Sequence, residues 1–313
     1  MISSSDNLVD FRMVECSHIS PILDAFSQVF KKSLSKAYYR WKYLSPEGYR
    51  SVVMVRKGQV IGHIGLASFS VSFDGLIHSA AMRHSSFVLP EYRGNGLYEA
   101  LNLFAQNRLR MDGVTFFQSW PNTENLKATL GKSLYDEVFP VSALTLETTG
   151  KFVADLTDFN PVSLIDLRYI TGLSDMYNDK VIYRINKDMI YFKRRYLDHP
   201  EKKFYLHIDD DSYFLFSMNR PGEIIIFEFY FGSNPLDFIK SFKNLFKRRQ
   251  VVFKVWCSLC ANSRAFKYFL KGGFVLRDFN CYSAVKSLDP SYLNRLRFIK
   301  DYDFSAGDSD VFG

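Results

Sequence analysis

The part of the chain whose residue types point most clearly to chemistry is the stretch 90–98, Pro-Glu-Tyr-Arg-Gly-Asn-Gly-Leu-Tyr. It lies between a strand pattern and a helix pattern that begins at Leu97. Glycine carries no side chain that would keep a ligand away from the backbone, so Gly94 and Gly96 leave several N–H groups open toward one point. A helix N-terminus also favours negative charge. The stretch therefore predicts a binding site for a phosphate or pyrophosphate.

The elements that must position this stretch follow from periodicity. Apolar residues at helical spacing predict a helix over 19–32, and the Asp74-Gly75 pair predicts a tight hairpin whose second strand ends at Leu89. A helix from Leu97 and a short strand over 114–117 follow the glycine turn. Antiparallel strands followed by one strand–helix–strand crossover predict a mixed α/β fold.

Part of this pattern returns in the second half of the chain. Residues 38–44 read Tyr-Tyr-Arg-Trp-Lys-Tyr-Leu, and residues 191–197 read Tyr-Phe-Lys-Arg-Arg-Tyr-Leu. In both places two strand patterns joined by a turn come next, in the same order. A match in residues and in the order of elements predicts two copies of one fold.

The stretch 90–96 resembles the phosphate motif of the GNAT superfamily of acyl-CoA N-acyltransferases. Arg93 and Gly96 match its Arg/Gln-x-x-Gly-x-Gly/Ala pattern, and a Pro-x-Tyr lead-in precedes them. Tyr98 departs from the pattern, since Gly or Ala is usual at that position. The resemblance covers residues 9–146. It implies a mixed α+β fold of two GNAT-like domains, each a mostly antiparallel twisted sheet with one parallel βαβ crossover and flanking helices.

The resemblance also implies domain limits. We expect an acyl-CoA-binding domain over 1–150 and a linker with the first helix of the second half over 151–180. A degenerate GNAT-like domain over 181–300 and an acidic, flexible tail over 301–313 complete the chain. The second copy has only Gly-Ser-Asn-Pro at 232–235 where a phosphate loop would stand, so we expect it to bind no coenzyme A.

In the superfamily, coenzyme A lies between the strand before the glycine turn and the strand after the helix. The co-substrate is accordingly expected to be acetyl-CoA or another acyl-CoA, with no metal. The residues that the resemblance assigns to its binding are Phe87, Val88, Leu89, Arg93, Gly94, Asn95, Gly96, Leu97, Tyr98, Asn122 and Asn125.

Acyl transfer from a thioester to an amine requires positioning, an oxyanion donor and a base. His84 is the nearest ionisable side chain on the strand expected to hold the pantetheine, and an imidazole titrates in the required range. Glu124 is a second candidate base. The general acid stays unassigned, because Leu130 and Phe269 stand where the superfamily often places a tyrosine, and Tyr135 is expected to be a core residue.

A Cys-x-x-Cys pair at 257–260 offers a different interpretation. It is expected to lie between a strand over 251–255 and a helix, where the helix N-terminus would stabilise the thiolate of a redox dithiol. The closing GNAT pattern, which includes Ala265, Lys271 and Gly273-Phe274, already accounts for the following helix. Two buried thiols are therefore the favoured interpretation, and no metal site is expected.

Composition excludes several classes of protein. The chain has a net charge of +7 and 47% hydrophobic residues, which excludes wholesale disorder. The basic clusters at 193–195 and 247–249 lack a nucleic-acid motif, so nucleic acid is not an expected partner. No apolar run is long enough to span a bilayer, the first ten residues do not resemble a signal peptide, and four cysteines make no disulfide scaffold. We expect a cytoplasmic protein that does not bind membranes.

The leading functional hypothesis is an N-acyltransferase, with acetyl as the expected acyl group and an amine acceptor bound between the two halves. The acceptor is expected to be a small molecule such as an amino sugar or amino acid, and a polyamine or a protein amine is an alternative. A Fem-like transferase that uses aminoacyl-tRNA is a second hypothesis, and a non-catalytic GNAT-derived binding protein is a third. The sequence leaves acyl chain length and oligomeric state open.

Overall fold

The computed structural model describes residues 8–46, 48–129, 134–147, 159–176, 183–220, 222–248, 254–260, 265–278, 281–296 and 302–303. The chain divides into two compact units built from non-consecutive segments. Unit 1 comprises Met1–Ser70, His78–Val138 and Ser283–Phe298. Unit 2 comprises Val71–Ile77, Phe139–Tyr282 and Ile299–Gly313. Each unit is described by itself.

The sheet of unit 1 contains the crossover that the sequence predicts. Its strands lie in the order β1 (Asp10–Met13), β4 (Val52–Arg56), β5 (Gln59–Phe73), β6 (Leu76–Val88), β7 (Phe116–Ser119) and β15 (Tyr282–Ser287). β6 and β7 run parallel and are joined through helix α3 (Leu97–Met111). β4 runs antiparallel to β1 and β5, and β15 runs antiparallel to β7. A two-stranded hairpin, β2 (Leu44–Ser45) with β3 (Gly48–Tyr49), stands apart.

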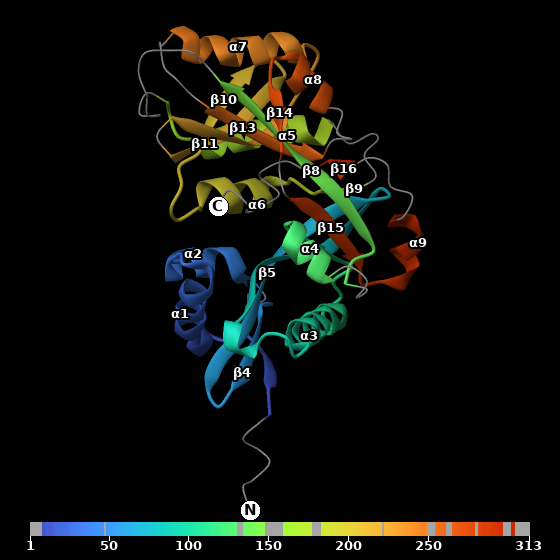
Figure 1. Ribbon diagram of the computed structural model, residues 1–313. Helices are drawn as coiled ribbons and strands as arrows, with labels where there is room; N and C mark the ends of the chain where they lie inside the picture. Colours follow the sequence, from blue (N-terminus) through green and yellow to red (C-terminus); the bar gives the residue numbers. More distant parts are fainter. Residues whose placement is uncertain are drawn as a thin grey trace, which may run out of the picture. The chain divides into compact units, whose positions relative to one another are not determined.

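Helices cover both faces of this sheet (Figure 1). On one face α1 (Ile19–Phe30) and α2 (Lys36–Tyr43) share a buried cluster with Val53 and Val55. On the other face α3 packs against Val52 and Met54. Neighbouring β4 residues join opposite clusters because successive strand residues point to opposite faces. This strand is buried on both sides, which suits its run of apolar residues.

The β5–β6 hairpin turns at the predicted dipeptide. Asp74 and Gly75 both adopt positive φ, at 52° and 76°. Both central residues of a two-residue type I′ turn require this conformation, which Asp and Gly adopt most readily. The turn fixes which residues of β6 lie opposite β5, and it thereby fixes the face that each β6 side chain occupies.

Unit 2 has a sheet of similar design. Its strands lie in the order β8 (Glu137–Glu147), β13 (Lys254–Cys260), β12 (Glu223–Tyr230), β11 (Ser212–Arg220) and β10 (Tyr205–Asp209). β12 and β13 are parallel, while the other three pairings are antiparallel. β14 (Val275–Arg277) pairs with β8. β9 (Tyr183–Ile185) pairs with β16 (Tyr302–Asp303) and with the end of β5.

The core of unit 2 lies on both faces of this sheet (Figure 1). Helices α5 (Leu164–Met176) and α6 (Met189–Phe192), with the π-helix η4 (Lys193–Leu197), pack against Ile225 and Phe227. Helices α7 (Pro235–Arg248) and α8 (Phe266–Lys271) pack against Ile224 and Ile226. The remaining short elements are η2 (Cys16–His18), η3 (Pro90–Tyr92), α4 (Thr123–Thr129), η5 (Pro290–Tyr292) and α9 (Leu293–Leu296).

The predicted mixed α/β fold is confirmed, with two differences in detail. The strand after α3 spans Phe116–Ser119, two residues later than predicted. The Cys-x-x-Cys segment forms part of β13, which continues through Cys260, and Cys257 pairs with Ile226 and Leu144. The expectation that this segment stands at a helix N-terminus is therefore wrong, and the redox interpretation loses its structural basis. The tail over 301–313 lies outside the described residues except for β16.

Candidate active site

The β6–β7 pair opens at one end. Four residue pairs join the strands, from Ala80–Phe116 to Arg83–Ser119. β7 then ends, whereas β6 continues for five more residues to Val88 and stays beside β5, since the Leu89 N–H donates to the Ile61 carbonyl at 2.9 Å. The edge of β6 beyond Arg83 has no β7 partner in the described pairing. Such backbone groups are ready to hydrogen-bond a ligand.

A backbone irregularity at Ser85 marks the start of this open edge. Ser85 has a φ of 46°, uncommon for a residue with a side chain. Tyr43 Oη donates to Ser85 Oγ at 2.8 Å, and His63 Nδ1 lies 2.9 Å from the Ser85 carbonyl oxygen. Because a carbonyl only accepts, the His63 proton sits on Nδ1, and Nε2 accepts from Tyr39 Oη at 3.0 Å. Two side chains thus hold the strained residue in place.

Burial sets the charge state of this support. His63 is fully buried, and desolvation lowers its pKa to about 4, so the imidazole is neutral at physiological pH. Burial, with Tyr43 nearby, also raises the pKa of Tyr39 well above its usual value. Both groups are therefore neutral hydrogen-bond partners and carry no charge into the site.

The glycine turn follows the open edge directly. Gly94 and Gly96 have φ of 84° and 71°, and a Cβ at either position would meet nothing within 4 Å. Gly96 is the N-cap of α3, and no side chain caps this helix. A helix leaves its first four N–H groups without an intrahelical acceptor. Arg93 Nε donates to the Val88 carbonyl at 3.0 Å and so ties the turn to the end of β6.

Tyr98, the residue that departs from the superfamily pattern, turns inward. Its ring lies over the guanidinium of Arg83, with 5.7 Å between the guanidinium carbon and the ring centroid. Tyr135 covers the same group at 5.4 Å and packs on the unit 1 core, as predicted. Burial acts to lower the pKa of Arg83, but the two tyrosines outweigh it and the pKa is raised. Arg83 is therefore a permanent buried cation.

The two predicted bases occupy different surroundings. His84 is half-buried on β6 between Arg83 and Ser85, while Glu124 is exposed in the first turn of α4.

The residues expected to bind the co-substrate lie on either side of this region. Asn122 Oδ1 accepts the Asn125 N–H at 2.8 Å, so the side chain of Asn122 caps the start of α4. The side chains of Phe87, Val88 and Leu89 are buried, which leaves their backbone as the part able to meet a ligand. Leu130 lies outside the described residues.

Sequence reasoning missed the two most informative residues, Arg83 and His63. Each is a polar residue within an otherwise buried strand, and each is at most 5% exposed. The signal was present, because charged residues are almost never fully buried unless they are paired. In the sequence, Arg83 follows the run Ser-Ala-Ala-Met at 79–82, so a charged residue stands inside a strand pattern that is otherwise apolar or small.

The corresponding end of unit 2 differs in its loop. β12 and β13 also share four pairs, from Glu223–Lys254 to Ile226–Cys257, and β12 continues to Tyr230. The loop 231–234 then leads into α7. Two of its N–H groups already have internal acceptors: Gly232 donates to Ser212 Oγ at 3.0 Å, and Ser233 donates to Asp211 Oδ2 at 2.9 Å. The Ser233 N–H lowers the pKa of Asp211.

A buried ionic network stands beside this loop. Glu228 is fully buried, and its carboxylate accepts hydrogen bonds from Tyr196 Oη, from Tyr191 Oη at 2.8 Å and from Lys187 Nζ at 2.6 Å. Tyr196 is the residue that the sequence repeat aligns with Tyr43. Each tyrosine donates to a side chain two residues beyond the last β-pair, Ser85 in unit 1 and Glu228 in unit 2.

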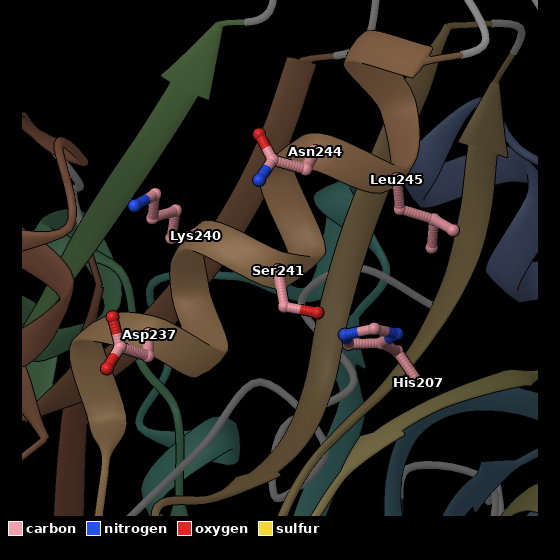
Figure 2. Close-up of a pocket in the computed structure, with 6 residues that line it drawn as sticks. All are labelled: His207, Asp237, Lys240, Ser241, Asn244 and Leu245. Carbon is pink, nitrogen blue, oxygen red and sulfur yellow. The ribbon is translucent and has the colours of Figure 1, made fainter.

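A hollow of about 300 Å³ opens along α7 in unit 2. Figure 2 shows Ser241 on the side of α7 that faces the His207 ring of β10, with Asp237, Lys240, Asn244 and Leu245 along the helix. Burial lowers the pKa of His207, and its Nε2 has no hydrogen-bond partner among the described residues. None of the lining residues belongs to β12 or to the loop 231–234.

Two searches of the described residues gave negative results. They contain no group of three or more His, Cys, Asp or Glu side chains placed to hold a metal ion. Within the same ranges, no helix has both the length and the apolar character that crossing a membrane requires.

Comparison with known proteins shows which families and structures this chain resembles. Residues 10–129 match the family model of the acetyltransferase (GNAT) domain. No curated protein matches the sequence. A GCN5-related N-acetyltransferase from Anabaena variabilis is similar in structure, with a TM-score of 0.66 and 17% identity over 90% of this chain and 73% of that chain.

Two further solved structures show the same fold. One is a probable N-acyltransferase from Enterococcus faecalis, with a TM-score of 0.65 and 13% identity over 90% of this chain and 72% of that chain. The other is the N-myristoyltransferase of Saccharomyces cerevisiae with bound myristoyl-CoA, with a TM-score of 0.59 and 9% identity over 91% of this chain and 80% of that chain. At these identities the likeness concerns the fold alone.

Proposed function

We propose that this protein is an acyl-CoA-dependent N-acyltransferase, because residues 10–129 match the family model of the GNAT acetyltransferase domain. The observation that carries the proposal is the junction of three features in unit 1. The open edge of β6, the turn with two positive-φ glycines and the uncapped start of α3 follow one another along residues 84–97.

This junction suits the two chemically different parts of an acyl-CoA. The α3 N-terminus offers N–H groups and helix dipole to the pyrophosphate, and open space at Gly94 and Gly96 lets the phosphates approach the backbone. The backbone of residues 87–89 offers hydrogen-bonding groups to the pantetheine amides. The side chains of Asn122 and Asn125, exposed at the start of α4, complete the proposed binding set.

The proposed reaction is aminolysis of a thioester. The amine nitrogen attacks the thioester carbonyl carbon, a C–N bond forms, the C–S bond breaks, and the thiolate of coenzyme A leaves. A backbone N–H beyond Ser85 stabilises the oxyanion, and the tyrosine and histidine that hold Ser85 keep that N–H in position. His84, with Glu124 as the second candidate, accepts the proton that the amine loses.

The acyl group is proposed to be acetyl, and the acceptor a small-molecule amine such as an amino sugar or amino acid. Unit 2 is proposed to bind no coenzyme A, because Asp211 and Ser212 already accept the N–H groups of its loop. Its role is then structural or in acceptor recognition. The two units are proposed to be copies of one GNAT-like fold, supported by the equivalent contacts of Tyr43 and Tyr196.

Isothermal titration with coenzyme A tests the proposal. We expect one site per chain in the wild type and a loss of binding in Gly96→Val, because a β-branched residue strains a φ of 71° and obstructs the turn. Gly113→Val is the matched control, since Gly113 has a φ of 73° and equally open surroundings at the other end of α3. Absence of binding in the wild type, or equal affinity in both variants, would refute the assignment.

Turnover separates an enzyme from a binding protein. Acetyl-CoA is offered with a panel of amino sugars, amino acids, polyamines and a lysine-rich peptide, and free thiol is measured. We expect amine-dependent thiol release that His84→Ala reduces at saturating acetyl-CoA. Tight coenzyme A binding without release for any amine would support the non-catalytic alternative and contradict the proposed reaction.

A further inference from the structure

Arg83 is a buried charge for which the described residues supply no counter-charge. It is 5% exposed. Its Nε and Nη2 donate to Ser119 Oγ at 3.2 and 3.0 Å, and its Nη1 donates to Asn102 Oδ1 at 2.7 Å. Among the described residues no carboxylate forms an ion pair with it. Neutral acceptors satisfy part of its hydrogen-bonding capacity but leave its charge uncompensated in a medium of low dielectric constant.

This cation lies next to the start of α3. Asn102, which accepts from Arg83, donates through Nδ2 to the Tyr98 carbonyl at 2.7 Å. Tyr98 is the second residue of the helix, and its ring covers the guanidinium. Arg83 is also the last β6 residue paired with β7. The charge is therefore buried where the open edge begins and one side chain away from the first turn of the helix.

Unit 2 supplies the internal comparison. Ile226 occupies the corresponding position, as the last β12 residue paired with β13, and it packs under α7 as Arg83 lies under α3. In unit 2 the Ser233 N–H of the loop before the helix donates to the Asp211 carboxylate. In unit 1 the N-cap of α3 is Gly96, which has no side chain to cap the helix. The buried cation thus accompanies the helix start that no N-cap side chain closes.

We propose that Arg83 is the buried counter-charge for the phosphates of acyl-CoA, which act on it from the far side of the first turn of α3. This inference rests on the proposed function and adds a residue and a mechanism to it. A buried cation destabilises the ligand-free protein, and a bound anion removes part of that cost. Because the charge is shielded from water, its attraction for phosphate is screened little by salt.

The test compares two ligands that differ in phosphate. Binding of coenzyme A and of pantetheine, which has no phosphate, is measured by titration calorimetry for wild type, Arg83→Met and Arg83→Lys. We expect Arg83→Met to weaken coenzyme A by about tenfold or more and to leave pantetheine nearly unchanged. Arg83→Lys should retain most of the affinity for coenzyme A, because it keeps the charge while losing the planar fork.

Arg110→Met is the matched control, since Arg110 is an exposed arginine near the C-terminal end of the same helix. Thermal melting gives a second measurement: ligand-free Arg83→Met should melt no lower than the wild type, and coenzyme A should raise its melting temperature less. Equal weakening of both ligands, or a lower melting temperature without ligand, would show that Arg83 only supports the fold. Failure of the wild type to bind coenzyme A would refute the proposed function instead.

Discussion

The turn before α3 and the loop before α7 follow similar pairs of parallel strands but differ in their hydrogen bonding. In each unit two parallel strands share four pairs, and the longer strand then continues alone. In unit 1 the following turn has two open glycines and a buried arginine behind it. In unit 2 the loop donates its N–H groups to Asp211 and Ser212. The same backbone design thus leaves the glycine turn open in unit 1 and binds the loop to an internal carboxylate in unit 2.

The strand residues that Tyr43 and Tyr196 contact differ in the same way. Ser85 is held by neutral partners, a tyrosine and a neutral histidine. Glu228 is a buried carboxylate held by two tyrosines and a lysine. A buried charge requires several good partners. In unit 2 the polar side chains near the end of the strand pair therefore hydrogen-bond one another. In unit 1 the β6 backbone beyond Arg83 has no β7 partner in the described pairing. A ligand-binding site requires such available hydrogen-bonding groups.

The largest expected effect comes from breaking the Glu228 network. Glu228→Ala leaves Lys187 as a half-buried charge without its carboxylate and frees two tyrosine hydroxyls, so the free energy of unfolding should fall by about 3–5 kcal/mol. The matched change in unit 1, Ser85→Ala, removes one neutral hydrogen bond and should cost about 1 kcal/mol. Urea denaturation of both variants measures the difference. Equal losses would contradict the contrast between an ionic and a neutral support.

The second effect is a dependence of stability on pH that arises in unit 1. The pKa of His63 is about 4 in the folded protein, against 6.5 as its ordinary value. The unfolded chain therefore binds more protons between these values, and stability should fall as pH decreases from about 6.5 to 4, by about 3 kcal/mol in total. Urea denaturation at pH 7.5, 6, 5 and 4.5 measures this slope.

His63→Gln removes the titrating group and should flatten that slope. His207 in unit 2 is the matched control, because burial lowers its pKa as well but it is less buried. His207→Gln should therefore change the slope less than His63→Gln does. A slope that persists in His63→Gln would locate the pH sensitivity elsewhere and weaken the account of how Ser85 is held.

The smallest expected effect concerns the internal anion of unit 2. Asp211→Asn keeps an acceptor for the Ser233 N–H but removes its charge, so stability should fall by about 1 kcal/mol or less, as for an altered helix cap. Coenzyme A should still bind at one site per chain, since no cation corresponds to Arg83 in unit 2. A second binding site in Asp211→Asn would show that this carboxylate alone had excluded the ligand.

Much of unit 1 was readable from the sequence because its signals are local. The Asp74-Gly75 hairpin, the helix from Leu97 and the glycine turn each depend on the conformational preferences of a few adjacent residues. The repeat at 191–197 likewise indicated that Tyr196 and Tyr43 hold equivalent positions, and each donates to the strand residue two positions beyond the last β-pair.

The remaining features depend on which distant residues meet. Domain limits drawn as consecutive residue ranges do not predict that β15 pairs with β7 in unit 1. They also do not predict that β8 pairs with β13 in unit 2. Strand pairing over such separations leaves no periodic mark in the chain. The partners of Arg83 come from α3 and β7, so only the fold shows that its charge is uncompensated.

The central claim is that unit 1, and not unit 2, holds acyl-CoA through the turn before α3. Hydrogen exchange monitored by mass spectrometry, with and without coenzyme A, tests it in both loops at once. The account predicts slower exchange of the amides at 94–99 on binding, with no change at 232–238. Protection at 232–238, or binding without protection at 94–99, would contradict it.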